Sequence, residues 1–312
     1  MRLRNSFRIL TDDFSNAYKI LLYRFITGVI GFSLAYVILT VNLRVIVDSG
    51  EIAELKRLLQ EVAAAFISAD AEYLQGFQAQ FTAALKDLVA LIGQNMSSIV
   101  GSVVGLCVIY LVSRFVNGLC TFAMGSVIND RMRLFTHAKF APAYFSNLGK
   151  ASLYQLVYVP LTFVYDVASV LICWFFFFYL LSFLPLLLTV FLAVTALVCL
   201  QALKLTAVSA WMPATIADGK RLGEAMRRSF GARKDFGVRF STFLICVYAI
   251  VIGNVIAALF TVGSALLLTV PTSYLLLLCV QFVNYYEEER KKYFVSFHKI
   301  ENAGDGTDVL GG

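Results

Sequence analysis

The chain has 312 residues, of which 59% are hydrophobic and only 15% are charged, and its formal net charge is +6. A soluble domain of this size needs more charged residues than this to cover its surface. The composition therefore excludes an ordinary water-soluble globular protein and predicts an integral membrane protein. The mean hydropathy of +0.77 agrees with that class.

Charge-free windows of about 20 residues, the length of a helix that crosses a bilayer, recur along the chain. The first apolar run follows Asp12 and Asp13, is too long for the core of a signal peptide, and is expected to stay as an anchor. We expect an all-α integral membrane protein with six transmembrane helices at about 20–43, 97–121, 151–180, 184–208, 239–263 and 267–286.

Charge decides the expected orientation of these spans. The segments before span one, after span two, between spans four and five, and after span six are basic, whereas residues 45–96 hold seven acidic residues against three basic ones. Because basic segments stay in the cytoplasm, we expect a multi-pass protein of the bacterial cytoplasmic (inner) membrane with both termini inside. Apolar residues recur twice at helical spacing within 45–96, which predicts a helical hairpin outside the membrane.

The sequence also carries an internal repeat. "MGSVINDRMRLF" from Met124 aligns without a gap with "MPATIADGKRLG" from Met212, and "RNSFRILTDDF" near the start weakly resembles "RRSFGARKDF". The repeat predicts three units, each a basic elbow helix followed by a transmembrane hairpin. The units are 1–123, with an interfacial N-terminal helix and the outer insertion at about 45–96, then 124–210 and 211–286, followed by a cytoplasmic tail, 287–312, that begins as a charged helix.

The third elbow, "WMPATIADGKRLGEAMRRSFGARKDFG" from Trp211, interrupts two apolar runs. Its proline suits a helix start, its first aspartate suits a helix cap, and an apolar stripe at four-residue spacing follows. Such a stripe flanked by cations is typical of a helix that lies on an anionic inner leaflet. The candidate interfacial or partner-binding residues are Pro213, Asp218, Lys220, Arg221, Glu224, Arg227, Arg228, Arg233 and Lys234.

This elbow has two other conceivable partners, a protein and a nucleic acid. A membrane or cytoplasmic protein is an alternative to the leaflet. Nucleic acid is not expected, because a surface that binds it interleaves exposed aromatic residues with its cations.

The elbow resembles a motif of several bacterial polytopic membrane families, including the membrane domain of glycerophosphodiester phosphodiesterases and related uncharacterised inner-membrane proteins. The resemblance covers one elbow and its hairpin, and the matching residues are Pro213, Asp218, Glu224, Ala225, Arg228 and Ser229. The chain has no room for the phosphodiesterase barrel, so the resemblance implies a membrane architecture and no catalytic residue. "EAMRRSFGARKDF" is also similar to the coupling loop of ABC importer permeases, although Met226 and the late Gly231 depart from that pattern.

Polar residues inside the predicted spans are the other candidates, because such residues are functional or paired. They are Asp166, Asn254, Arg114, Asn117 and Ser33. Asp166 and Asn254 occupy equivalent positions of the repeat, so they either line one cavity for a small substrate or proton, or each bonds a neighbouring helix. From the helical rise, Arg114 and Asp166 differ by about 10 Å in depth, so they meet only if the spans are offset.

No catalytic constellation is visible in the sequence. The six cysteines lie in apolar runs without a C-x-x-C pair and the two histidines are far apart, so we expect no catalytic residue, no cofactor and no metal. The favoured function is a non-enzymatic accessory or scaffold protein whose basic elbows bind the inner leaflet or a partner. The alternative is a transporter or ABC-type permease component with a polar intramembrane site around Asp166 and Asn254.

Overall fold

The structure is a computed structural model that describes residues 2–68, 71–136, 138–181, 183, 186–231, 235–296 and 299–301. In this part of the chain, six helices are long and apolar enough to cross a membrane. The predicted all-α polytopic membrane protein is therefore confirmed. The chain forms two compact units, one of residues 1–26 with 114–312 and one of residues 27–113. Helices α2 (Ser15–Val47) and α5 (Met96–Leu134) contribute to both.

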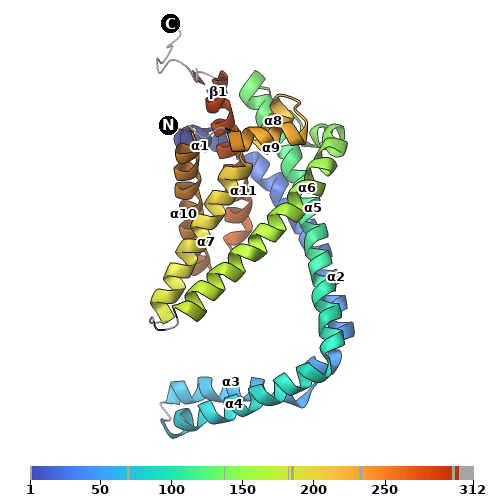
Figure 1. Ribbon diagram of the computed structural model, residues 1–312, viewed down its shortest axis with the longest axis vertical. Helices are drawn as coiled ribbons and strands as arrows, with labels where there is room; N and C mark the ends of the chain where they lie inside the picture. The colour runs from blue at the N-terminus through green and yellow to red at the C-terminus, as the bar shows by residue number, and fades with distance from the viewer. Residues whose placement is uncertain are drawn as a thin grey trace. The chain divides into compact units, whose positions relative to one another are not determined.

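The unit of residues 27–113 contains a helical hairpin. Helices α3 (Gly50–Ser68) and α4 (Ala71–Gln94) pack along each other, as Figure 1 shows. Leu58 and Ala84 are buried between them. The hairpin predicted for this segment is thus present, and its position outside the membrane stays a prediction.

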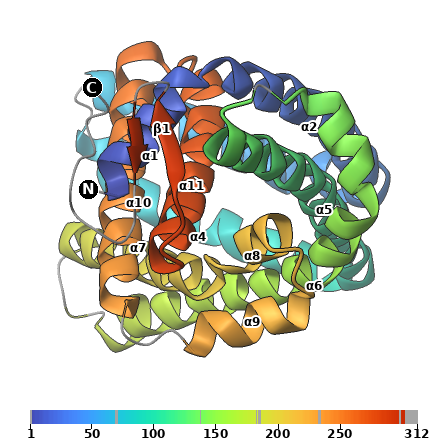
Figure 2. The same cartoon turned by 90° about the horizontal axis from the view of Figure 1, so that it is seen from above.

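The larger unit contains the other elements, which Figures 1 and 2 show from two directions. Helix α10 packs on α7 and α11, α7 packs on α6, and α1 packs on α11. The bounds are α1 (Arg2–Asp12), α6 (Phe140–Trp174), the π-helical turn η1 (Phe175–Leu180), α7 (Leu186–Val208), α8 (Trp211–Ala217), α9 (Leu222–Gly231), α10 (Phe236–Thr261), α11 (Leu266–Glu288), β1 (Tyr293–Ser296) and β2 (Lys299–Glu301).

The main core lies at one end of this unit, where α1 is found. We call this end the α1 end. The core includes Ile9 of α1, Met124 of α5, Trp211 of α8 and Phe282 of α11, all almost completely buried. The predicted interfacial helix α1 therefore packs its inner face on protein. Two ion pairs fix the end of this helix as well, since Arg131 of α5 donates to Asp12, the last residue of α1, and to Asp13, which follows it.

The two aligned elbow segments differ in local structure. The segment from Met124 is the last part of α5, which continues unbroken to Leu134, whereas the segment from Met212 belongs to the separate short helix α8. Pro213 explains the difference, because proline is tolerated in the first turn of a helix and disrupts a helix interior. The two segments pack closely: a Cβ built on Gly125 would lie 3.0 Å from the Met212 Sδ atom. The repeat itself stays a prediction.

The tail prediction was wrong in its first part. Helix α11 ends at Glu288, and β1 and β2 then form an antiparallel hairpin in which Phe294 pairs with Ile300. The alternating burial of side chains explains β1: Tyr293 and Val295 are buried, whereas Phe294 and Ser296 are only half-buried. Residues 302–312 lie outside the described part of the chain.

The orientation predicts which surfaces an impermeant maleimide reaches in intact cells. We expect Lys86→Cys, on the exposed face of α4, to react before lysis, and Arg227→Cys, exposed on α9, to react only after lysis. The wild-type protein, which already has an exposed Cys107, measures the background. The reverse labelling order would contradict the charge-based orientation.

Candidate functional site

Asp166 of α6 is the centre of an ionic cluster inside the spans. Its carboxylate accepts hydrogen bonds from Lys204 Nζ at 2.6 Å and from Gln201 Nε2 at 3.1 Å. Arg114 Nη1 of α5 lies 2.9 Å from the other carboxylate oxygen. We call Arg114, Asp166, Gln201 and Lys204 the ionic site. Its three charged side chains are partly buried, with exposed fractions of 21% for arginine, 24% for aspartate and 12% for lysine.

Helical spacing explains why these groups converge. Gln201 and Lys204 are three residues apart on α7, so they lie on one face of that helix. Thr162 lies one turn before Asp166 on α6 and accepts a hydrogen bond from Arg114 Nη2 at 3.0 Å. Three helices therefore meet around one carboxylate.

The contact between Arg114 and Asp166 corrects the expected difference in depth. The expected difference of about 10 Å followed from spans at residues 97–121 and 151–180 and the helical rise. Helix α5 is instead 39 residues long and extends well beyond residues 97–121, so the spans are offset. That offset brings Arg114 to the level of Asp166.

The other polar candidates have different partners. Asn254 of α10 donates from Nδ2 to Ser273 Oγ of α11 at 3.3 Å, so its contact is with a neighbouring helix and not with α6. Ser33 lies in the unit of residues 27–113, where its hydroxyl donates to the Val29 carbonyl of its own helix at 2.9 Å. Asn117 is half-buried on α5. The ionic site thus contains two of the five predicted residues.

The third elbow leaves two of its described cations, Arg221 and Arg227, exposed. On α9, Ala225 and Ser229 are buried, and Leu222 and Met226 pack against the main core. The described part of the predicted apolar stripe, Leu222 and Met226, therefore packs on protein, and the side chain of Phe230 lies outside the described residues.

The elbow candidates that the structure describes surround this packed face. Arg221, Glu224 and Arg227 are exposed, and Lys220 is half-buried. Arg233 and Lys234 lie outside the described residues, as does the side chain of Arg228.

The sequence predicted that Asp218 caps the following helix, but α9 begins four residues later, at Leu222, and Asp218 is the C-cap residue of α8. Its carboxylate accepts a hydrogen bond from the Tyr285 hydroxyl of α11 at 2.6 Å and forms ion pairs with Lys220 and Lys291. The carbonyl of Arg221 accepts hydrogen bonds from the N–H groups of Glu224 and Ala225 in the first turn of α9. Asp218 therefore ties the elbow to α11, while Pro213 is buried in α8.

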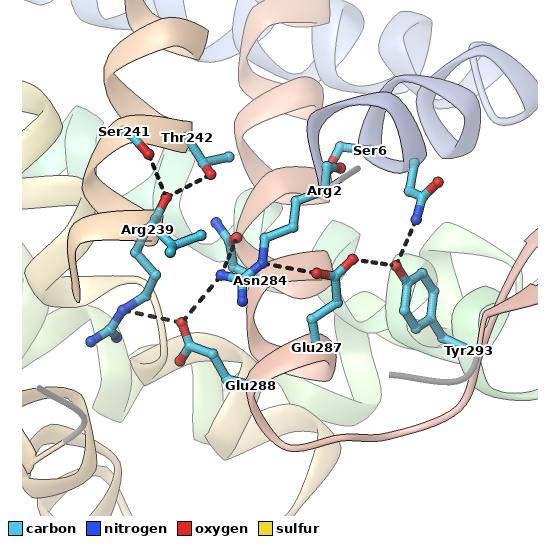
Figure 3. Close-up of polar contacts among 11 residues, drawn as sticks. Arg2, Ser6, Arg239, Ser241, Thr242, Asn284, Glu287, Glu288 and Tyr293 are labelled. Atoms are coloured by element: carbon cyan, nitrogen blue, oxygen red, sulfur yellow. Dashed lines mark hydrogen bonds and ion pairs between the residues drawn. The ribbon is translucent and has the colours of Figure 1, made fainter. Parts of the chain in front are cut away.

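A second ionic group at the α1 end was missed by sequence reasoning. Arg239 of α10, only 1% exposed, places Nε 3.1 Å from Glu288 of α11. Arg2 of α1 places Nε 2.8 Å from Glu287, which also accepts a hydrogen bond from the Tyr293 hydroxyl at 2.9 Å. Figure 3 shows this chain of contacts, which we call the end cluster.

Two arginines and two glutamates balance in the end cluster, and they join α1, α10, α11 and β1. Burial, reinforced by the neighbouring Glu287 carboxylate, raises the pKa of Tyr293 far above its usual range. The phenol therefore stays protonated and remains a donor. No sequence motif announces this group, because its contacts join distant residues, such as Arg2 and Glu287, which are 285 residues apart.

Comparisons with known proteins returned no match: no family model, no curated protein and no solved structure corresponds to this chain. Among the described residues, no three His, Cys, Asp or Glu side chains lie close enough to hold a metal ion. The candidate sites are therefore defined by their geometry and charge.

The end cluster predicts a large effect of one buried arginine on stability. Arg239→Gln leaves the Glu288 carboxylate without its nearest cation, so we expect the free energy of unfolding to fall by about 3 kcal/mol. Thermal unfolding of the detergent-solubilised protein measures this change. Arg8→Gln, on the exposed face of α1, is the matched control and should change stability by less than about 0.5 kcal/mol. Equal effects of the two variants would contradict the structural role of the cluster.

Proposed function

We propose that this is a non-enzymatic accessory or scaffold protein of the bacterial cytoplasmic membrane that holds its inner face on the anionic leaflet through its basic elbow. The observation that carries this proposal is the orientation of α9. Its small and apolar side packs on the core, while Arg221 and Arg227 point away from it.

This orientation favours a particular kind of binding. Because Leu222 and Met226 already pack against the core, the described apolar residues of α9 are only partly available for insertion into lipid. The remaining attraction is electrostatic, on the order of 1 kcal/mol for each basic residue near an anionic surface, and salt weakens it. Headgroup binding at the surface is therefore expected, without insertion of α9.

The elbow is also held in a fixed position. Its contacts with α11 through Asp218 keep the short segment between α8 and α9 in place, and Gly219 adopts a positive φ of 63° there. A basic surface that is fixed in advance loses little conformational entropy when it binds. The resemblance of this elbow to those of bacterial polytopic membrane families supports a shared membrane architecture.

The lipid preference of the reconstituted protein tests this proposal. We expect the double variant Arg221→Gln, Arg227→Gln to lower the association of spin-labelled phosphatidylglycerol relative to phosphatidylcholine at least about fivefold, since each residue contributes on the order of 1 kcal/mol. The control Lys56→Gln, Lys86→Gln removes the same charge from exposed positions of α3 and α4.

An unchanged lipid preference in the elbow variant would overturn the leaflet proposal. If the same variant then lost a stoichiometric protein partner, the elbow would be a protein docking surface instead.

A second function, a transporter or permease component, is favoured by one observation. The ionic site places Arg114, Asp166 and Lys204 from three helices at one level inside the apolar spans, and charged groups in such positions often lie on ion or substrate pathways. In a transport cycle, the contacts among these three charged groups would break and form again.

Proton flux into proteoliposomes that contain a trapped pH-sensitive dye tests the transport function. We expect Asp166→Asn to reduce flux to the level of empty liposomes while the protein remains folded, because the pathway loses its only carboxylate. Asn254→Ala, which alters a polar group bonded to α11, is the control and should retain flux. Flux that is equal in wild-type protein and Asp166→Asn would contradict this function.

A further inference from the structure

We propose that the outer face of α1 is a lipid-docking surface, in which Phe7 inserts into the anionic leaflet at the α1 end while Arg4 and Arg8 contact the phosphate groups of its lipids. The inference rests on the proposed function in one respect, because both concern the same leaflet. It names a second contact with that leaflet, one that inserts an apolar side chain, and it does not require the cations of α9.

Helical spacing gives α1 an inner and an outer face. The inner face consists of four buried residues, Asn5, Ser6, Ile9 and Leu10. The outer face consists of four exposed residues at positions i, i+3, i+4 and i+7, namely Arg4, Phe7, Arg8 and Thr11. Contacts of the inner face, including the hydrogen bond that Asn5 donates to the Tyr293 hydroxyl at 3.0 Å, fix the rotation of the helix. The outer face is therefore held away from the core.

Both ends of α1 lie at the ends of helices that are long and apolar enough to cross the membrane. At its start, Arg2 places Nε 2.8 Å from Glu287 in the last turn of α11. At its other end, only Asp13 and Phe14 separate α1 from α2. The start of the first span and the end of the sixth lie on the same side of the membrane, so a helix that joins them runs along the membrane surface. Figure 1 shows α1 and β1 together at this end of the unit.

The first turns of α2 mark the level at which the lipid begins. Tyr18 and Leu22 are 54% and 63% exposed on a helix that is apolar enough to cross the membrane. The ring of Phe14 packs edge-on against that of Tyr18, with the ring centres 5.9 Å apart. Aromatic residues such as tyrosine gather at the boundary between headgroups and acyl chains. Because α1 runs along the surface and ends two residues before Phe14, its outer face lies at this boundary.

The unpaired charge on the outer face is positive. The acidic residues at the end of α1, Asp12 and Asp13, both pair with Arg131. In the part of the chain that the structure describes, neither Arg4 nor Arg8 forms an ion pair. Arginine donates in a planar fork to phosphate oxygens. An anionic leaflet complements this charge and is the partner already present at the level of the helix.

Phe7 adds an apolar contact between the two cations. It is 53% exposed, and arginines precede it by three residues and follow it directly, so their aliphatic stems can lie along lipid while their guanidinium groups reach the phosphates. A helix with an aromatic residue on a cationic outer face is typical of segments that lie in the membrane interface. The described apolar residues of α9 pack on the core, so α1 supplies the insertion that α9 does not.

Tryptophan fluorescence of the full-length protein in vesicles of phosphatidylcholine and phosphatidylglycerol tests the proposal. Trp174→Phe removes the exposed tryptophan of α6, and Trp211 remains buried in the core. In this background, Phe7→Trp places a reporter on the outer face of α1, and lipids brominated at different carbons of the acyl chain report its depth. We expect quenching that corresponds to a depth of about 5–10 Å, as for other interfacial helices.

The matched control is Ile300→Trp in the same background. Ile300 is also 53% exposed but lies on β2, beyond the end of α11, so its reporter should not be quenched. Absence of quenching in Phe7→Trp, or equal quenching in the two variants, overturns the proposal. Thr11→Trp, on the same face of α1, replaces Phe7→Trp if that variant does not fold.

Charge variants test the part played by the arginines. We expect Arg4→Gln, Arg8→Gln to lower the association of spin-labelled phosphatidylglycerol relative to phosphatidylcholine at least about fivefold, since each basic residue near the surface contributes on the order of 1 kcal/mol. The same change should reduce quenching of the reporter in Phe7→Trp. Unchanged lipid association and unchanged quenching would contradict the assigned role of the arginines.

The elbow variant separates this inference from the proposed function. Arg221→Gln, Arg227→Gln leaves α1 intact and should leave the quenching of Phe7→Trp unchanged. Quenching that persists although the elbow variant keeps its lipid preference would support docking of α1 and contradict binding by the elbow. An elbow effect without quenching at Phe7→Trp would overturn only the present inference.

Discussion

The cost of removing a charge from water governs the arrangement of this protein. A charged side chain in an apolar bundle is tolerated when an opposite charge lies beside it with good hydrogen-bond geometry. Asp166 between Arg114 and Lys204 satisfies this condition, and so does Arg239 beside Glu288. These contacts fix which helices are neighbours, because each pair joins different helices.

The pairs at the α1 end also determine what the elbow can do. The end cluster holds α1 and β1 on α11, and two residues of the same helix, Tyr285 and Tyr286, donate to Asp218 and Asn129. The first contact fixes the elbow and the second fixes the last part of α5. With both segments packed on the core, Arg221 and Arg227 are left exposed. Packing inside the protein thus produces the basic surface proposed to bind the leaflet.

The sequence was sufficient for the six spans and the helical hairpin, because long apolar windows and helical periodicity are local signals. It failed where distant residues decide the structure. The end cluster joins Arg2 to Glu287 across nearly the whole chain, and β1 depends on burial of Tyr293 against α1. The ionic site could be predicted only in part. Asp166 was recognisable as an acidic residue inside a span, but its partners depend on an offset of α5 that the composition does not encode.

The two buried ionic groups differ in a way that bears on function. Arginines and glutamates are equal in number in the end cluster, so it is complete without a ligand and is suited to holding elements together. Around Asp166, Arg114 and Lys204 face one carboxylate, which also accepts a hydrogen bond from Gln201. Charged groups inside apolar spans are often functional, so the ionic site and not the end cluster is the candidate for a substrate or ion pathway.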